Sequence, residues 1–579
     1  MGEYKTPGVY IKEKNAFGNS VVEVETAIPA FIGYTEKARN GNDDLKNVPW
    51  KISSMTEFIQ YFGGAPTLNF TVDIETYNVA EETENQDGTT PSITDDAKAE
   101  LKSGIFEYTV ELKEKDDKIK GYTFCIKGKN KYTLYYNMLL FFANGGGICY
   151  IISVGNYKEN SEIVKKDFDG VFNKLKLIQE ITMIVIPEAV NLSAENDFKD
   201  VQQQMLSHCG YDMKNRFALL DIYPKADENT GINSQVEVFW NNIGSNFLSY
   251  GAAYFPWLNT SVLGDRDLDG SMFTWTKTAY DNLGKFAQVD DKLQRIAESF
   301  MHTTLVVEEE KTITIGGIEY KYADIRTDVL HEKSGNDVPV TVEKSNPNKK
   351  TITFSPPYVV DKTGFHLALN NASYLYQQAM KAVKKSLNLL PPSAAMAGIY
   401  TMVDRSRGVW KAPANVTLSY VDSVAEDIDD EQQAGLNAPM NGKAINVIRP
   451  FRGEGIKVWG ARTLDGNSLD WRYINVRRTL LFLEESVKNA ARAYVFEPND
   501  AGTWINMKCM IENFLRSVWK RGGLAGATPE EAYEVHIGLG DTMTAEDILE
   551  GIMRITVLVA VTHPAEFIEI TFQQQMQKS

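Results

Sequence analysis

Residues 145–154 read GGGICYIISV, three glycines that lead directly into a run of mainly apolar side chains. Just before them, Met138–Phe142 is apolar throughout and predicts a helix that the glycines end. Ile148–Val154 lacks the strict polar alternation of a half-exposed strand, as is typical of a strand covered on both faces. No Lys-Ser or Lys-Thr follows the glycines, so a phosphate-binding loop is not favoured. The stretch therefore predicts a helix-to-strand connection into a parallel sheet.

Similar apolar runs lie on both sides of this stretch. Ala27–Tyr34, Thr182–Ile186 and Phe217–Asp221 each predict a buried strand, and Phe168–Ile178 predicts a helix between two of them. Buried strands that alternate with helices are typical of an α/β layer with a mostly parallel sheet. We expect residues 23–70 and 136–260 to form this α/β domain.

The remaining sequence divides into an arm, two insertions and a C-terminal unit. Residues 1–22 contain a Pro-Gly break and predict an N-terminal arm. Residues 71–135 and 261–362 alternate polar and apolar residues around turn signals, which predicts two β-rich insertions. Residues 363–579 predict an α+β domain with helices near 475–494 and 503–520, and with strands at 554–561 and 567–572. The expected fold class is thus multidomain, α/β and α+β.

Charge and cysteine content exclude several classes of protein. The 60 Lys and Arg residues against 77 Asp and Glu residues give a net charge of −17, which argues against direct nucleic-acid binding. The four cysteines are far apart and form no metal or redox pair, so we expect reduced, mostly buried thiols. The longest apolar runs, Ile181–Ile186 and Ile555–Val561, are too short to span a bilayer, so no direct membrane partner is expected.

Two acidic stretches allow a cation-binding interpretation beside a structural one. Asp265–Gly270 (DRDLDG) matches the first half of a calcium loop, but the twelfth position is Thr276 instead of the bidentate glutamate. A polar surface turn is favoured, and a calcium-dependent surface-binding module is kept as the alternative function. Asp427–Glu431 (DIDDE) is interpreted as a solvated loop, with a cation or a basic partner surface as alternatives.

The sequence gives no support for an enzyme. The six histidines are scattered, none belongs to an HExxH pair, and no serine stands in a GxSxG motif. No nucleophile therefore has a recognisable base. We expect no catalytic residues, no metal ligands and no cofactor.

Short β-prone segments lie close to both ends of the sequence. Val9–Ile11 follows the Pro-Gly break, and Phe567–Phe572 precedes the last residues. Such a strand pairs either within its own sheet or with the open sheet edge of a neighbouring subunit. The pattern leaves both possibilities open.

Several motifs resemble the sheath proteins of contractile phage tails and contractile injection systems. They cover the first 70 residues, about 136–260 and nearly all of 390–579. The motifs are TPGVYIKE (6–13), IPAFIGYT (28–35), FFANGGGICY (141–150), PPSAAMAGIY (391–400), DRSRGVWKAPAN (404–415), VWGARTL (458–464), WRYINVRR (471–478), FEPND (496–500) and PAEFI (564–568). The glutamine-rich tail 573–577 looks more like the extracellular, phage-like subgroup.

The resemblance implies a structural machine. Subunits would polymerise around an inner tube as a helical homopolymer of stacked rings, in a metastable extended state, and contract to drive the tube into a target. The implied partners are further copies of the chain, the inner tube protein, and baseplate and terminal cap proteins. Assembly would take place in the bacterial cytoplasm, and the particle would be released from the cell or form part of a virion tail.

The resemblance also suggests roles for individual residues. It implies an N-terminal linking strand at Val9, Tyr10 and Ile11. The C-terminal domain 363–579 would end in a linking strand within 565–579, at Phe567, Ile568, Ile570 and Phe572. Thr503–Lys520 is the candidate tube-facing helix, against the alternative of a solvated face; its polar residues are Lys508, Glu512, Arg516 and Lys520. Subunit contacts or pairing within the domain are expected for Arg405, Arg407, Arg462, Arg477 and Arg478.

Overall fold

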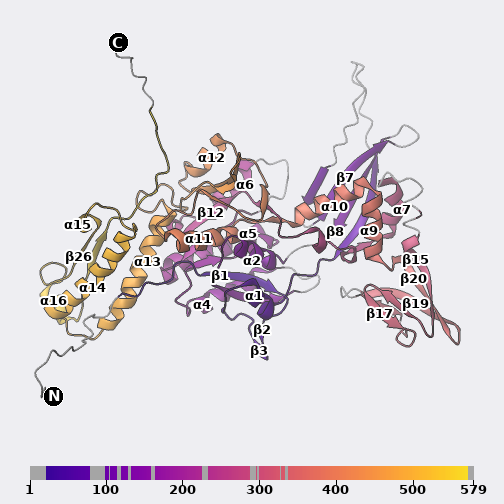
Figure 1. Ribbon diagram of the computed structural model, residues 1–579, viewed down its shortest axis with the longest axis horizontal. Coiled ribbons are helices and arrows are strands. Elements are labelled where there is room, and N and C mark those ends of the chain that lie inside the picture. Colours follow the sequence, from indigo (N-terminus) through magenta and orange to yellow (C-terminus); the bar gives the residue numbers. More distant parts are fainter. Residues whose placement is uncertain are drawn as a thin grey trace, which may run out of the picture.

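The computed structural model places three regions along an elongated molecule (Figure 1). It describes residues 21–78, 98–102, 105–113, 119–127, 132–157, 163–223, 232–286, 295, 299–326, 328–332 and 337–571. A central α/β domain lies between a pair of long helices, α13 and α14, at one end and a small β module, with β15, β19 and β20, at the other.

The α/β domain is built on a nine-stranded sheet in the order β22-β25-β24-β12-β11-β10-β1-β9-β4. The six strands from β24 to β9 run parallel, and antiparallel strands close both edges. The predicted mostly parallel sheet is therefore confirmed. Its strands are β1 (Pro29–Thr35), β4 (Trp50–Ile52), β9 (Cys149–Asn156), β10 (Met183–Val185), β11 (Phe217–Leu220), β12 (Gly251–Phe255), β22 (Val416–Thr417), β24 (Ile445–Phe451) and β25 (Gly455–Val458).

Helices cover both faces of the sheet. Successive side chains of each strand point to opposite faces, and both sets are apolar, so each face needs a covering layer. Phe31 of β1 packs with α1 (Met55–Phe62), α2 (Leu134–Ala143) and α11 (Ser393–Arg407). Ala30 and Ile32 of the same strand point to the opposite core. The helices on that opposite side are α3 (Lys165–Asp169), α4 (Val171–Leu175), α5 (Glu195–Ser207) and α6 (Ile232–Asn242).

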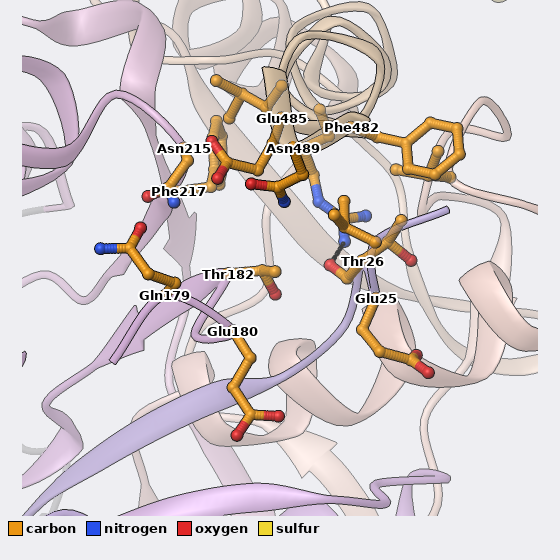
Figure 2. Close-up of a pocket in the computed structure, with 14 residues that line it drawn as sticks. Glu25, Thr26, Gln179, Glu180, Thr182, Asn215, Phe217, Phe482, Glu485 and Asn489 are labelled. Atoms are coloured by element: carbon orange, nitrogen blue, oxygen red, sulfur yellow. Dashed lines mark hydrogen bonds between the residues drawn. The ribbon is translucent and has the colours of Figure 1, made fainter. Parts of the chain in front are cut away.

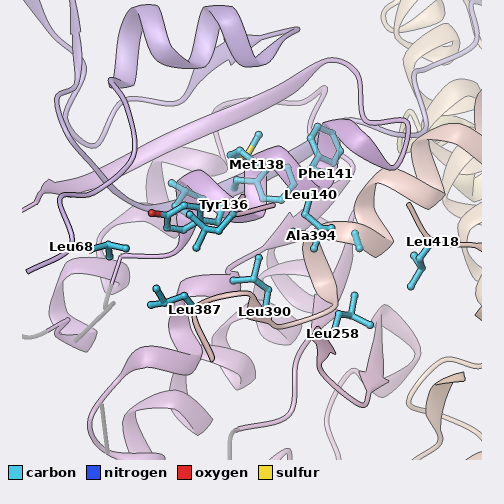
Figure 3. Packing of buried hydrophobic residues seen from close by; sticks show 14 of the residues in the cluster. Leu68, Tyr136, Met138, Leu140, Phe141, Leu258, Leu387, Leu390, Ala394 and Leu418 are labelled. Carbon is cyan, nitrogen blue, oxygen red and sulfur yellow. The ribbon is translucent and has the colours of Figure 1, made fainter. Parts of the chain in front are cut away.

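Helices α2 and α11 cross closely on the first face. Side chains of α2, among them Met138 and Phe141, gather beside Ala394 of α11 (Figure 3). A Cβ atom at Gly398 would lie 2.6 Å from the backbone oxygen of Phe141, so the crossing depends on a glycine at this position. The N-terminus of α2 is fixed by the buried Glu188 carboxylate, which accepts the backbone N–H of Leu134 and of the residue before it.

The boundary expected at residue 363 differs from the structure. Strand β24 pairs with β12 and continues the parallel sheet, and α11 packs on it, so residues from about 389 to 465 complete the α/β domain. The short strands β21 (Leu389–Leu390) and β23 (Val421–Val424) flank β13 (Leu258–Thr260) in a three-stranded sheet. The physical reason is that β24 extends the parallel sheet by pairing with β12, where Ile445 lies opposite Ala253, about 190 residues earlier in the chain.

The two predicted insertions share one sheet. Its order is β14-β5-β8-β7-β6, and β14 from the second insertion pairs in parallel with β5 from the first. Three helices accompany it, and their buried residues join the core of α2 and α11. The elements are β5 (Phe70–Asn78), β6 (Lys98–Lys102), β7 (Ile105–Lys113), β8 (Ile119–Lys127), β14 (Phe273–Trp275), α7 (Lys277–Phe286), α9 (Lys362–Ala372) and α10 (Tyr374–Leu387).

A smaller β module follows with its own apolar core, which includes Val307, Ile352 and Phe354. A buried ion pair of 2.7 Å between Glu332 and Lys362 connects this module to α9. The strands are β15 (Met301–Glu308), β16 (Thr312–Ile315), β17 (Ile318–Lys321), β18 (Val329–His331), β19 (Asp337–Asn346) and β20 (Lys349–Val359). The β-rich character predicted for residues 71–135 and 261–362 is present in their described parts.

Candidate subunit interface

The C-terminal domain consists of two long helices packed on a β-ribbon. The elements are α13 (Ile474–Ala491), α14 (Ala501–Lys520), β26 (Tyr533–His536) and β27 (Thr556–Val559), with the short helices α15 (Pro529–Ala532) and α16 (Ala545–Leu549). Phe482 of α13 meets Phe514 of α14 with ring centroids 5.9 Å apart. Tyr533 and Val535 of β26 point into the same core. The two predicted helices are therefore present, with ends within a few residues of those expected.

The ribbon exposes hydrogen-bonding edges. β26 and β27 pair antiparallel from Tyr533 with Val559 to His536 with Thr556. Within the described residues this sheet has two strands. Just after the end of β27, Val561 forms an isolated antiparallel bridge with Leu524. An unpaired strand edge is a template for a further strand.

The C-terminal segment after β27 is held at Glu566. Its carboxylate accepts two hydrogen bonds from the Arg462 guanidinium, at 2.9 and 2.7 Å, and one each from Asn437 and Tyr473, at 2.7 and 2.9 Å. Burial favours the neutral acid, but these hydrogen bonds outweigh it and hold the pKa of Glu566 below its usual value. Glu566 is thus the anchor of the segment.

Beyond this anchor the apolar side chains face solvent. Phe567 and Ile568 are each 78% exposed, and Ile570 is 70% exposed. Residues 567–571 form no strand in the single chain, so the strand expected at 567–572 lacks a partner here. Phe572 lies outside the described residues. The exposure of three large apolar side chains in one segment is unusual for a surface that stays in water.

The segment that leads into β1 lies along the C-terminal domain. The N–H of Val24 donates to Ser486 on α13 at 3.2 Å, and Arg478 donates to the carbonyl of Thr26 at 3.0 Å. Glu23 forms an ion pair with Arg521 at the end of α14. The predicted linking strand at 9–11 lies outside the described residues.

The five arginines singled out in the sequence separate into two groups. Arg478 is buried and forms a two-pronged pair with Asp404, at 2.8 and 2.6 Å, and Arg462 binds Glu566. Arg477 is buried between the rings of Tyr250 and Trp471, with its guanidinium carbon 3.9 and 4.5 Å from the ring centres. Of the two expectations, a subunit contact or pairing within the domain, the single chain therefore contains an internal ion pair for Arg462 and for Arg478.

Arg405 and Arg407 form the second group. Both are exposed at the C-terminal end of α11. Arginines with exposed guanidinium groups remain available to carboxylates of another molecule. A subunit contact through Arg405 and Arg407 stays a prediction.

Helix α14 has a buried apolar side and a mixed exposed side. The core side includes Ile511, Leu515 and Val518. Of the four polar residues expected to face a tube, Lys508 and Glu512 are half-buried and 3.9 Å apart, whereas Arg516 and Lys520 are exposed. The arrangement fits a solvated face as well as a contact surface, so the tube-facing role stays a prediction.

The acidic stretches have local partners. Asp265 pairs with Lys384 at 2.6 Å, Asp267 accepts the N–H of Gly264, and Asp269 accepts that of Ser271. Asp429 caps helix α12 (Asp430–Asn437). In the described part of the chain no three His, Cys, Asp or Glu side chains are grouped closely enough to hold a metal ion. None of the helices described there has the length and apolar character needed to cross a bilayer.

Sequence reasoning missed the Glu566 anchor. The motifs indicate Arg462 as a candidate subunit contact and assign Glu566 no role of its own. A usable signal existed, because VWGARTL and PAEFI each carry a single charge and the two charges are opposite. Opposite charges in two otherwise apolar motifs are candidates for a buried pair.

Comparison with known proteins agrees with this architecture. Residues 467–575 match the family model of the phage tail sheath C-terminal domain. The tail sheath protein of Vibrio phage KVP40 is 27% identical over 135 residues, which are 23% of this chain and 20% of that relative. The matched part thus spans about a fifth of the curated relative's length.

Two solved structures share the fold along the whole chain. The contracted sheath complex of PVC, an extracellular contractile injection system, has a TM-score of 0.51 at 23% identity and covers 100% of this chain and 99% of its own. The contracted helical sheath of the anti-feeding prophage has a TM-score of 0.51 at 24% identity, with 99% and 100% covered. Residues 467–575 are thus similar in sequence to the phage tail sheath C-terminal domain, and the chain has the fold of these contractile sheath proteins. The resemblance in the sequence motifs is confirmed.

Proposed function

We propose that the protein is the structural subunit of a contractile sheath. The observation that carries the proposal is the segment after Glu566, which is fixed at its root by four hydrogen bonds and then exposes Phe567, Ile568 and Ile570 to solvent. A segment of this kind gains a buried environment and backbone partners when it adds a strand to the ribbon of another copy.

The ribbon β26–β27 is the matching acceptor. Its edges offer backbone donors and acceptors, and its inner face already packs on α13 and α14. The donor segment and the acceptor ribbon are different surfaces. Each copy would therefore add its C-terminal strand to one neighbour and accept the strand of another neighbour on its ribbon. Head-to-tail contacts of this type generate open helical polymers.

The same arrangement suits a subunit that moves during contraction. A strand joined to its domain at a fixed root keeps its backbone hydrogen bonds to a neighbour while the domains rotate. The extended polymer would be a kinetic trap above the contracted one, so contraction needs no nucleotide. This agrees with a structural, non-enzymatic role, which the sheath family also suggests.

The partners and place of action follow from this proposal. The chain would surround an inner tube protein, with α14 as the candidate contact, and join baseplate and terminal cap proteins at its ends. Assembly would occur in the bacterial cytoplasm, before release of the particle or its use as a virion tail. The likeness to extracellular injection systems along the chain favours that subgroup over a phage tail.

Negative-stain electron microscopy of the purified protein tests the proposal. Hollow ridged tubes of uniform width are expected, because the contracted polymer forms without a tube. If discrete particles form instead, co-expression with an inner tube protein is the second experiment. Discrete particles under both conditions contradict a sheath subunit.

The N-terminal arm is tested in the same assay. Removal of residues 1–12 is expected to leave a folded monomer that forms no long polymers. Circular dichroism provides the control for folding. Polymers of normal length from the truncated protein would contradict the linking role of Val9–Ile11.

A further inference from the structure

A pocket of about 230 Å³ opens between the α/β domain and helix α13. Its walls come from four places: the segment 24–26 that leads into β1, the residues around the starts of β10 and β11, Val409 just after α11, and one side of α13. Figure 2 shows the side chains of Asn215, Glu485 and Asn489 lying near one another, whereas the Glu180 side chain points away.

The pocket holds two buried acceptor atoms that lack partners. Asn215 is 7% exposed and Glu485 is 8% exposed. Within the described residues, neither Oδ1 of Asn215 nor Oε1 of Glu485 receives a hydrogen bond. The other carboxylate oxygen of Glu485 pairs with Lys488 at 3.0 Å, so only one of the two oxygens has a hydrogen-bond partner. Buried acceptors in a folded protein normally have a donor.

The cation in the wall does not supply that donor. The Arg478 guanidinium is engaged by both oxygens of Asp404 and by the carbonyl of Thr26. The remaining lining is largely apolar and includes Phe217, Leu481 and Phe482. The pocket therefore combines apolar walls with acceptors at one side.

This combination identifies the chemical class of the ligand. Lys and Arg side chains carry an apolar stem and a cationic head that only donates hydrogen bonds. The stem fits walls such as Phe217 and Phe482, and the head fits Glu485 and Asn215. A bare metal ion would leave the apolar walls unused, and in the described residues no metal-binding cluster is present.

We infer that this pocket receives a Lys or Arg side chain from a second copy of the chain. The inference rests on the proposed sheath function, because a polymer places a neighbour at a fixed position beside every pocket. Charge complementarity supports this occupant: Glu485, a residue of the pocket wall, carries a buried carboxylate oxygen that lacks a donor, and the chain carries exposed cations such as Arg405 and Arg407. A charge-assisted hydrogen bond to Glu485 would then form only in the assembled state.

The direct test is cryo-electron microscopy of the assembled wild-type tubes at side-chain resolution. The expected result is density for a Lys or Arg of a neighbouring copy, with its head within hydrogen-bond distance of Glu485 Oε1. A pocket that holds only water, or a side chain of its own copy, overturns the inference while leaving the sheath function intact. Failure of the wild type to polymerise with the tube protein overturns both.

Two variants and a control provide a test in solution. Glu485→Gln removes the charge, and we expect its critical concentration for polymerisation to rise at least tenfold. Asn489→Lys places a cation one helical turn from Glu485, where it competes with the neighbour's side chain, so polymerisation should weaken while the monomer unfolds at the same or a higher temperature. Glu237→Gln, an exposed residue of α6, is the matched control and should stay within twofold of wild type. Wild-type polymerisation by Asn489→Lys would contradict the inference.

Discussion

Arg462 and Glu566 form a two-pronged ion pair across 104 residues of sequence, with N–O distances of 2.9 and 2.7 Å. Arg462 lies just after β25 in the α/β domain, and Glu566 lies in the C-terminal segment. The planar guanidinium fixes both the position and the direction of the carboxylate. The pair therefore defines where the described segment stops contacting its own chain and where its exposed part begins.

Glu566→Gln is expected to weaken the attachment of the C-terminal segment to Arg462. A neutral amide lowers the strength of the two bonds from Arg462, and the cost to the free energy of unfolding is about 1–3 kcal/mol. Hydrogen exchange of the amides in 563–571 should become faster. Glu569→Gln changes an exposed residue three positions later and serves as the control. Equal exchange in both variants would contradict the anchor.

The anchor also has a pH dependence of defined sign. Burial opposes the charge on Glu566, and its hydrogen-bond donors hold its pKa below the usual glutamate value of 4.5 despite that burial. A lowered carboxyl pKa stabilises the fold above the unfolded pKa, and this contribution is lost as the pH falls through the folded pKa. Amide exchange in 563–571 should therefore accelerate below about pH 4, and Glu566→Gln should remove most of that acceleration.

Charged substitutions in the exposed segment should block assembly. Phe567→Asp and Ile570→Asp change residues that already face solvent in the single chain, so monomer stability should stay within about 0.5 kcal/mol of wild type. In a strand added to a neighbour, the same charges would be partly buried at a much larger cost. Sedimentation of polymers measures the loss. Phe567→Leu and Ile570→Val are the matched controls, and polymers of normal yield from both aspartate variants would show that this segment does not link subunits.

The α/β domain could be predicted from sequence because its signals are local. Continuous apolar runs such as Cys149–Asn156 of β9 and Pro29–Thr35 of β1 mark buried parallel strands whatever their neighbours are. The helices α13 and α14 were predictable for a similar reason, since each carries an apolar stripe at helical spacing.

Long-range pairing was not predictable in the same way. β24 joins β12 at Ile445 opposite Ala253, and β14 joins β5 at Phe273 opposite Phe70, across sequence separations that leave no local periodicity. Local patterns therefore do not indicate that the chain after residue 363 returns to the α/β sheet or that the two insertions share a sheet. In the candidate interface, the exposed segment was predictable from its β-prone residues. For the Arg462–Glu566 anchor the sequence offered only the opposite charges of two motifs, and the geometry of the pair required the folded arrangement.

A buried acid at the start of α11 should control stability as a function of pH. Asp221 accepts hydrogen bonds from the backbone N–H and the hydroxyl of Ser393, at 2.9 and 2.5 Å, and burial raises its pKa to about 7. Between the unfolded pKa near 3.8 and this value, the folded chain holds a proton that the unfolded chain has lost. The free energy of unfolding must then fall as the pH rises through this window.

Asp221→Asn tests this pH-dependent contribution to the free energy of unfolding. The amide cannot titrate, but it can still accept a hydrogen bond from the Ser393 N–H and donate one to the Ser393 hydroxyl. The variant should flatten the fall in stability between about pH 4 and 7, by at most about 4 kcal/mol for a pKa that burial raises from 3.8 to about 7. Urea unfolding at several pH values measures it. Parallel pH profiles of variant and wild type would mean that Asp221 is charged in the folded protein.

The crossing of α2 and α11 offers a matched pair of glycine substitutions. Gly398→Ala places a methyl group 2.6 Å from the backbone oxygen of Phe141 and 2.9 Å from Cβ of Asn144, so the two helices must separate. Gly435→Ala, in helix α12, meets no atom within 4 Å and gains helix propensity. We expect Gly398→Ala to lower the free energy of unfolding by about 1–3 kcal/mol and Gly435→Ala to raise it by about 0.5–1 kcal/mol. Urea denaturation of the monomers measures both, and equal stability of the two variants would mean that the helices do not approach as closely as Gly398 allows.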